Sequence, residues 1–221
     1  MKVCSIYLGL LPFWALSAYA SAINVDLGTA DSFAVLAGST VTNTGATNVH
    51  GNLGVGPGTA ITGFPPGIVS GGTIHAADAV AMRAQSDLTT AYNFAAGEAS
   101  GNVLTGQDLG GLTLTPGVYS FASSAQLTGT LRLNAQGDPN AVFLSQIGST
   151  LTTASGSSVV FTNGGQGDSV FWQVGSSATL GTTTAFEGNI LALTSITLNT
   201  GANIGCGRAL ARNGAGDAGH E

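Results

Sequence analysis

Charged residues are scarce in this chain of 221 residues, in which they make up only 7% of the total. Globular proteins usually contain about 25%. There is a single lysine, Lys2, and the formal net charge is −6. Nucleic acids and anionic membranes bind clustered Lys and Arg, so neither is an expected partner. The hydrophobic content of 43% also excludes an ordinary disordered tail, because that amount of apolar surface supports a core.

Cysteine is almost absent, and its placement suggests a secreted protein without disulfides. Residues 1–20 are typical of a signal peptide: Lys2 is followed by an apolar stretch over residues 6–16 and by small residues ending at Ala20. Cleavage after Ala22 is the alternative end. A retained membrane anchor is the other interpretation, but the apolar stretch is too short to span a bilayer. Residues 21–221 then form one mature extracellular domain whose only cysteine is Cys206.

Residues that could carry catalysis or hold a metal are isolated from one another. The three histidines, His50, His75 and His220, have no second His or Cys at metal-ligand spacing. The carboxylates occur singly, whereas a β-helical glycosidase or lyase needs a pair in a cleft. No catalytic residue, metal ligand or cofactor is predicted.

Glycine and threonine, in contrast, are abundant, with 34 and 26 residues. Five short segments repeat a pattern of one aliphatic residue between small polar residues. They lie at 39–43, 125–129, 149–153, 178–182 and 196–200. A strand period of two turns the central residue inward and its neighbours outward. The inward residues, taken as level with one another, are Val41, Leu127, Leu151, Leu180 and Leu198.

More apolar segments at 33–36, 142–145 and 170–173 alternate with these along the chain. A third set includes 131–133 and 159–161. Three strands per repeat predict a three-faced β-solenoid with irregular coils. One helix is expected over about 75–98, packed along the face made by the apolar strands. Its expected apolar stripe is Ala77, Val80, Ala84, Leu88, Ala91 and Ala95. Because the helix separates the first strands from the later ones, the solenoid is interrupted in sequence, and the first strands could stack on later ones.

The outward residues of the threonine-bearing strands form a neutral grid. Threonine is stiff at χ1, so the grid is preorganised and presents methyl groups beside hydroxyl groups. A flat, uncharged, periodic partner such as ice or crystalline polysaccharide suits this surface. The alternative is that threonine is present only because it favours strands.

A resemblance to a known family covers nearly the whole mature chain in order. The matching segments are 27–30 with 33–37, 51–58, 61–67, 111–119, 143–152, 170–175 and 207–214. They resemble the secreted ice-binding, or antifreeze, protein family, and among its members the snow-mould fungal ones most. The resemblance implies a mainly β protein: a discontinuous right-handed β-solenoid with one long α-helix alongside. It further implies binding to an ice crystal surface, without enzyme activity or a metal.

Some members carry a Thr-Ala/Gly-x-Thr/Asn motif on the ice-binding face, which 44–47 and 200–203 match here. Combining this motif with the grid gives the candidate ice-binding residues. They are Thr40, Thr42, Thr44, Thr47, Thr128, Thr150, Thr152, Thr179, Thr182, Thr197 and Asn199. The expected form is a secreted monomer. A polysaccharide-binding or structural cell-surface β-helix protein is the alternative function.

The C-terminal segment departs from the family. Residues 215–221 show no strand pattern, and Cys206 lies in an unexpected Gly-Cys-Gly insertion. We therefore expect an open strand edge at the end of the solenoid.

Overall fold

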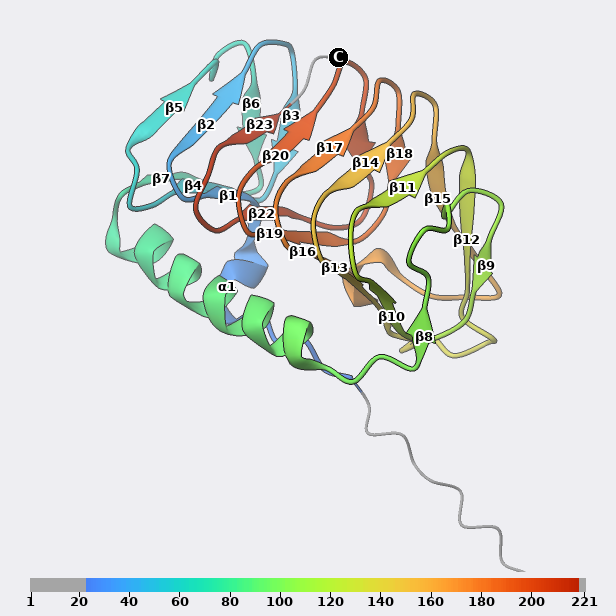
Figure 1. Ribbon diagram of the computed structural model, residues 1–221. Helices are drawn as coiled ribbons and strands as arrows, with labels where there is room; N and C mark the ends of the chain where they lie inside the picture. The colour runs from blue at the N-terminus through green and yellow to red at the C-terminus, as the bar shows by residue number, and fades with distance from the viewer. Residues whose placement is uncertain (1–22, 219–221) are drawn as a thin grey trace, which may run out of the picture.

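The computed structural model describes residues 23–218, so the predicted signal peptide lies outside the described residues. The chain winds into a parallel β-solenoid with three faces and one long helix beside it (Figure 1). Parallel pairing throughout and one strand per face in most coils confirm the expected architecture.

The first face is a nine-stranded sheet, the most apolar of the three. In spatial order its strands are β8 (Asn102–Val103), β10 (Gly117–Phe121), β13 (Phe143–Ile147), β16 (Val170–Val174), β19 (Asn189–Ala192), β22 (Ala209–Ala211), β1 (Phe33–Ala37), β4 (Asn52–Val55) and β7 (Ile74–Ala76). Every residue of β16 is buried, because the helix side of this sheet is covered as well as the core side.

The second face has seven strands, and the third is divided into two sheets. The second face consists of β11 (Ala125–Leu127), β14 (Leu151–Thr153), β17 (Ala178–Leu180), β20 (Ile196–Leu198), β23 (Gly216–Ala218), β2 (Thr40–Asn43) and β5 (Ala60–Thr62). The third face consists of β9 (Thr113–Leu114), β12 (Thr130–Asn134), β15 (Ser158–Thr162), β18 (Ala185–Phe186) and β21 (Asn203–Ile204), then of β3 (Asn48–His50) and β6 (Ile68–Ser70). Short 3-10 turns, η1 (Gly28–Ser32) and η2 (Gly167–Ser169), precede β1 and β16.

The solenoid is discontinuous, as expected. The last coil of the chain, β22–β23, pairs with β1–β2 at the start of the chain, so that Leu210 lies level with Leu36. Arg208 stabilises this junction, because its guanidinium forms ion pairs with the carboxylates of Asp31 at 2.9 Å and Asp168 at 3.1 Å.

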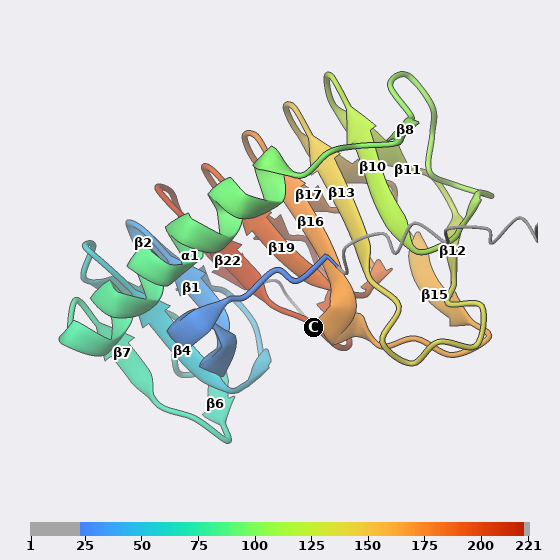
Figure 2. The same ribbon diagram turned by 90° about the horizontal axis from the view of Figure 1, so that it is seen from below.

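The helix α1 (Ala79–Gly97) runs along the first face (Figure 2). It begins later than expected because His75 belongs to β7, and Asp78 caps the helix by accepting a hydrogen bond from the Ala81 N–H at 2.8 Å. The buried stripe follows the prediction from Ala84 onward. Ala77 lies outside the helix and Val80 is 46% exposed, so these two predicted members were wrong. Ala81 begins the buried face instead.

The expectation of a tail without strand structure was wrong. Residues 216–218 form β23, which is hydrogen-bonded between β20 and β2. Its sequence carries no strand pattern, but two neighbouring strands complete its hydrogen bonds, so tertiary context outweighs propensity.

The predicted register was also wrong by two residues at several places. Ala125, not Leu127, lies level with Leu151. Gly216 pairs with both Ile196 and Val41, so Val41 lies level with Ile196 and not with Leu198. Leu180 and Leu198 are level, as expected. A shift of two leaves each side chain on its expected side of the sheet, because the period of a strand is two.

Candidate functional site

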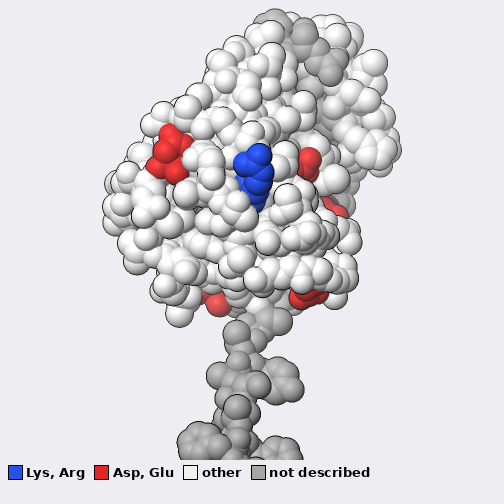
Figure 3. Space-filling view, turned by 90° about the vertical axis from the view of Figure 1, so that its right-hand side faces the viewer, with Lys and Arg blue, Asp and Glu red and all other residues white. Residues whose placement is uncertain are grey.

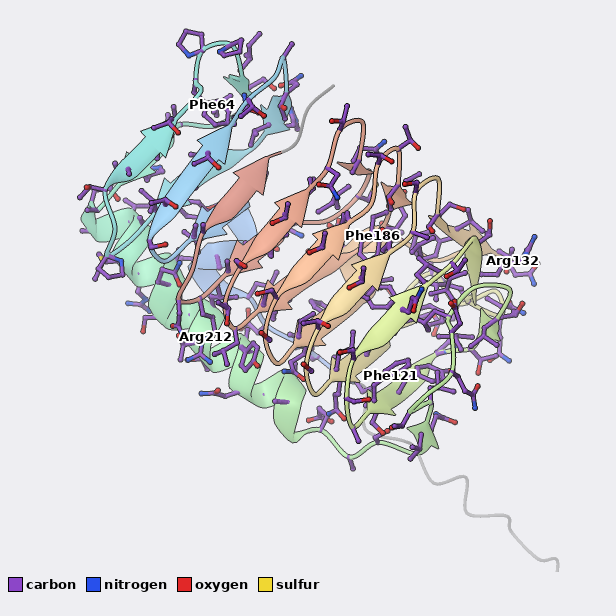
Figure 4. All side chains as sticks on the ribbon, turned by 45° about the horizontal axis from the view of Figure 1, so that its top comes forward. Phe64, Phe121, Arg132, Phe186 and Arg212 are labelled. Atoms are coloured by element: carbon purple, nitrogen blue, oxygen red, sulfur yellow. The ribbon has the colours of Figure 1, made fainter. Side chains whose placement is uncertain are left out.

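The second face presents its seven strands side by side in one layer (Figure 4). Beneath it lies a continuous inward row. Its members from β11 to β2 are all buried: Ala125, Leu151, Ala178, Ile196, Gly216 and Val41. This row packs into the interior of the solenoid and holds the layer rigid from below.

The outward residues form two parallel rows across the strands. On each strand, the residue directly after the inward residue belongs to one outward row, which we call the threonine row. Its members are Gln126, Thr152, Thr179, Thr197, Thr42 and Thr62. The backbone of Asp217 occupies the register position between Thr197 and Thr42. The residue directly before the inward residue belongs to the other outward row, which we call the serine row. Its members are Ser124, Thr150, Ser177, Ser195, Ala215, Thr40 and Ala60.

The two rows define a regular array of small side chains. Adjacent strands lie about 4.7–4.9 Å apart, and alternate residues along one strand are about 6.5–7 Å apart. In the serine row the hydroxyls bond to each other: Thr150 donates to Ser124 at 2.8 Å, and Ser177 and Ser195 are 2.9 Å apart. These bonds fix the hydroxyl positions along the row.

Three hydroxyls of the threonine row are more available. Those of Thr152, Thr179 and Thr197 have no hydrogen-bond partner within residues 23–218. Each Thr is β-branched and restricted at χ1, so its methyl and hydroxyl groups keep one orientation. The row therefore offers both hydrogen-bonding and apolar groups at a fixed spacing.

A ridge of exposed hydroxyls borders the array where the second face turns into the third. It consists of Thr128, Ser155, Thr182, Thr200 and Thr44. Thr182 donates to Ser155 at 2.6 Å, and the Gly156 N–H bonds to the Thr182 carbonyl at 2.8 Å. Successive turns are thus stacked in register.

Buried hydroxyls hold this ridge from inside. Thr153 and Thr184 join their hydroxyls at 2.8 Å, and the Thr153 hydroxyl also accepts the Gly181 N–H at 2.8 Å. Ser157 donates to the Leu127 carbonyl at 3.0 Å. Each contact joins two neighbouring coils.

Charge is sparse around the array. Asp108 lies at its β11 end, where the N–H groups of Gly110 and Thr128 bond to its carboxylate at 2.6 and 2.9 Å. Burial raises the pKa of Asp108, but these hydrogen bonds outweigh burial and lower it overall. The end of the molecule in Figure 3 is mostly uncharged, with isolated acidic and basic side chains. Within residues 23–218, no three His, Cys, Asp or Glu residues come together as metal ligands.

Cys206 lies away from the array, exposed at the turn between β21 and β22. Its N–H donates to Glu187 at 2.8 Å. Desolvation, together with the charges of Glu187 and Asp168, raises the pKa of the thiol. A raised pKa keeps the thiol protonated at neutral pH and slows its oxidation.

The structure brings most of the expected residues together, but not all. Thr42, Thr152, Thr179 and Thr197 share the threonine row, whereas Thr40 and Thr150 belong to the serine row. Thr44, Thr128 and Thr182 lie on the ridge, and the half-buried Asn199 follows β20 beside it. Thr47 is the exception, because it lies at the entry to β3 and lines a cavity on the third face.

Sequence reasoning missed Ser177, Ser195 and Thr62. The two serines directly precede inward residues, so a correct register would have found them. Thr62 lies on β5, which the repeat comparison did not include.

Comparison with known proteins shows the family to which the chain belongs. The model of the ice-binding-like family matches residues 35–215. The chain belongs to this family. An ice-binding protein of Nostoc sp. (strain HG1) is 61% identical over 212 residues, which span 96% of this chain and 78% of that protein.

Solved structures of ice-binding proteins share the fold. One from an Antarctic biological consortium is 46% identical, with a TM-score of 0.85 over 99% of this chain and 95% of the other. One from the Antarctic ascomycete Antarctomyces psychrotrophicus is 40% identical, with a TM-score of 0.84 over 88% and 96%. The expected special likeness to snow-mould fungi is not established by these values. The ice-binding family is a family of binding proteins rather than of catalysts.

Proposed function

We propose that this protein is a secreted, monomeric antifreeze protein that adsorbs to ice through the second face. The observation that carries the proposal is the threonine row, in which Thr152, Thr179 and Thr197 lie level on adjacent strands. Membership of the ice-binding family supports the choice of ice as the partner.

The physical argument rests on preorganisation. The side chains of the array are short and stiff, so ordering them at an ice surface costs little conformational entropy. Hydroxyls offer hydrogen bonds to surface water, and methyl groups bury apolar area. Many weak, evenly spaced contacts add up over seven strands. An ice front blocked at the adsorbed molecules has to curve between them, and this curvature arrests growth.

This mode of action needs no catalytic step, cofactor or metal. Within residues 23–218, the outward register positions of the face are occupied by uncharged residues except at Asp217, and this low charge density suits an uncharged partner. Among residues 23–218, no helix has the length and apolarity of a membrane span.

A bulky substitution on the threonine row tests the face assignment. Thr152→Tyr raises a ring above the layer, so we expect thermal hysteresis to fall several-fold while the circular dichroism spectrum stays unchanged. Thr113→Tyr is the matched control, because Thr113 is an exposed β-strand threonine on the third face. Nanolitre osmometry on both variants measures the effect.

Equal hysteresis in the wild type and in Thr152→Tyr would exclude this face. Absence of hysteresis in a folded wild-type protein would exclude ice binding itself. Retention of that folded protein on chitin or cellulose would then favour a polysaccharide as the partner of the flat face.

A further inference from the structure

Thr73, His75 and Asp78 form a hydrogen-bonded chain where β7 leads into α1 (Figure 1). The Thr73 hydroxyl lies 2.9 Å from Nε2 of His75, and Nδ1 of His75 lies 2.7 Å from a carboxylate oxygen of Asp78. A hydroxyl, an imidazole and a carboxylate in this order are the parts of a nucleophilic triad, which is recognised by its geometry and not by its spacing in the sequence. None of the three residues belongs to the threonine row, the serine row or the ridge, so binding to ice leaves this group without a role.

The direction of the two hydrogen bonds follows from Asp78. The hydrogen bond from the Ala81 N–H and then the one from His75 lower the pKa of Asp78, so at neutral pH its carboxylate is ionised and only accepts hydrogen bonds. Nδ1 of His75 therefore carries the proton, and Nε2 of the neutral imidazole is an acceptor. The Thr73 hydroxyl donates to Nε2, which places His75 to remove the proton from Thr73.

The imidazole is held in place, while the hydroxyl is open to solvent. The side chain of His75 is 16% exposed, and its ring packs against the ring of Phe33 with the centroids 5.5 Å apart. Thr73 is exposed, and its N–H donates to Oδ1 of Asn52 at 2.9 Å, which anchors the residue to β4. A reactant can therefore reach the hydroxyl of Thr73 while the base keeps its orientation.

A backbone donor directly follows the hydroxyl. Among residues 23–218, β7 is the last strand of the first face, and the Thr73 carbonyl accepts the Leu53 N–H of β4 at 3.1 Å. Successive residues of a strand direct their amide groups to opposite sides, so the Ile74 N–H points away from β4, to the open edge. In α/β-hydrolases the N–H of the residue after the nucleophile stabilises the oxyanion. The Ile74 N–H is the corresponding group here.

We propose that Thr73 is a nucleophile that accepts an acyl group from a small, activated ester. The Thr73 hydroxyl oxygen attacks the carbonyl carbon of the ester as its proton passes to Nε2 of His75. The bond between that carbon and the leaving oxygen then breaks, and the leaving oxygen takes the proton from His75. The products are O-acyl-Thr73 and a free alcohol. Because the exposed hydroxyl encloses little of the reactant, the ester needs a good leaving group, such as a phenolate.

A second pair of hydroxyl and imidazole lacks the carboxylate. Nδ1 of His50 lies 3.3 Å from the Ser70 hydroxyl, which donates to Oδ1 of Asn48 at 2.9 Å. Within residues 23–218, His50 forms no ion pair with a carboxylate, whereas His75 does. Ser70 is therefore a matched control in the same molecule: it has an imidazole beside it but no oriented base.

Acetylation by para-nitrophenyl acetate tests the proposal on the full mature chain. Peptide mass spectrometry locates the acetyl groups, and the absorbance of the released nitrophenolate gives the rate. The single lysine, Lys2, lies in the predicted signal peptide, so no lysine side chain of the mature chain competes. We expect an acetyl group on Thr73 and at least about tenfold slower labelling of Ser70, because general base catalysis is missing there.

Asp78→Asn tests the orientation of the base and keeps the helix cap, because Asn caps a helix as well as Asp does. The Asn amide can donate to Nδ1 of His75, which moves the imidazole proton to Nε2 and removes the acceptor for Thr73. We expect acetylation of Thr73 to slow at least about tenfold. His75→Gln should have the same effect, whereas Thr73→Ser should keep the reaction, because serine supplies the same hydroxyl. Circular dichroism shows that each variant is folded.

Equal rates of Thr73 acetylation in the wild type and in folded His75→Gln would overturn the proposal, as would equal labelling of Thr73 and Ser70. An acetyl group that stays on the ring of His75, or no acetyl group on Thr73 at all, would also overturn it. These outcomes do not depend on ice binding, since the three residues lie outside the second face.

Discussion

At the scale of single residues, neighbouring threonines have opposite roles. Thr152 points outward and its hydroxyl has no partner within residues 23–218, whereas Thr153 is 3% exposed and its hydroxyl bonds to Thr184 and to the Gly181 N–H. The composition alone does not separate these roles. The outward threonine meets the partner, and the inward threonine fixes the distance between coils.

This difference predicts opposite responses to the same substitution. Thr153→Val keeps the shape but leaves the Gly181 N–H unpaired in the interior and removes the shorter of the two hydrogen bonds of the Thr184 hydroxyl, which costs about 1–3 kcal/mol. Thr152→Val, at the surface, changes the free energy of unfolding by about 0.5 kcal/mol or less. Urea denaturation of both variants measures the difference. Equal stabilities would show that the buried hydroxyl pair contributes nothing.

At the scale of elements, β23 shows that neighbours can impose strand structure on a weak sequence. Gly216 occupies an inward position between Ile196 and Val41, where the other strands carry aliphatic or alanine side chains. Its backbone is not in the left-handed region. A Cβ there would lie 3.6 Å from the side chains of Ala37 and Val35, which is ordinary van der Waals contact.

Alanine at this position should therefore stabilise the protein. Gly216→Ala restricts the unfolded chain and fits the folded one, so we expect a gain of about 0.4–1 kcal/mol. Gly38→Ala is the control at the same junction, because its Cβ would collide with the Arg212 carbonyl. Thermal and urea denaturation should show the two variants on opposite sides of the wild type. A destabilised Gly216→Ala protein would contradict the close fit of β23.

At the scale of the whole molecule, a few carboxylates join distant segments. Asp87 of the helix accepts hydrogen bonds from the hydroxyl and N–H of Thr29 at 2.6 and 2.9 Å, which ties η1 to α1. These bonds, helped by Arg83 and opposed by burial, lower the pKa of Asp87. The charged form is therefore the one that the folded state favours.

A lowered pKa makes part of the stability dependent on pH. The contribution of Asp87 is fully present above the ordinary Asp pKa near 4, and it is lost as the pH falls through the lower folded value. Asp87→Asn should lower the melting temperature at pH 7, and the difference from wild type should shrink progressively as the pH falls below about 4. Melting curves over this range check the prediction. Parallel curves would show that Asp87 is not linked to folding.

Local pattern determined which side each side chain takes. The period of two placed Val41, Leu151 and Leu180 inward and Thr42, Thr152 and Thr179 outward, because it depends only on adjacent residues. The spacing of apolar residues likewise predicted the helix. It placed the start too early, at about residue 75, because His75 belongs to β7 and the helix begins at Ala79. The scarcity of Lys and Arg likewise argued against a basic surface, because a composition is read without any tertiary contact.

Tertiary structure decided register, coil order and the role of weak segments. Whether Leu151 is level with Ala125 or Leu127 depends on the lengths and shapes of the connecting turns, and a shift of two leaves the alternation unchanged. The stacking of β1–β2 on β22–β23, and the strand at residues 216–218, arise from pairing between distant parts of the chain. Long-range pairing energies, which no local window contains, therefore aligned the threonines into one row.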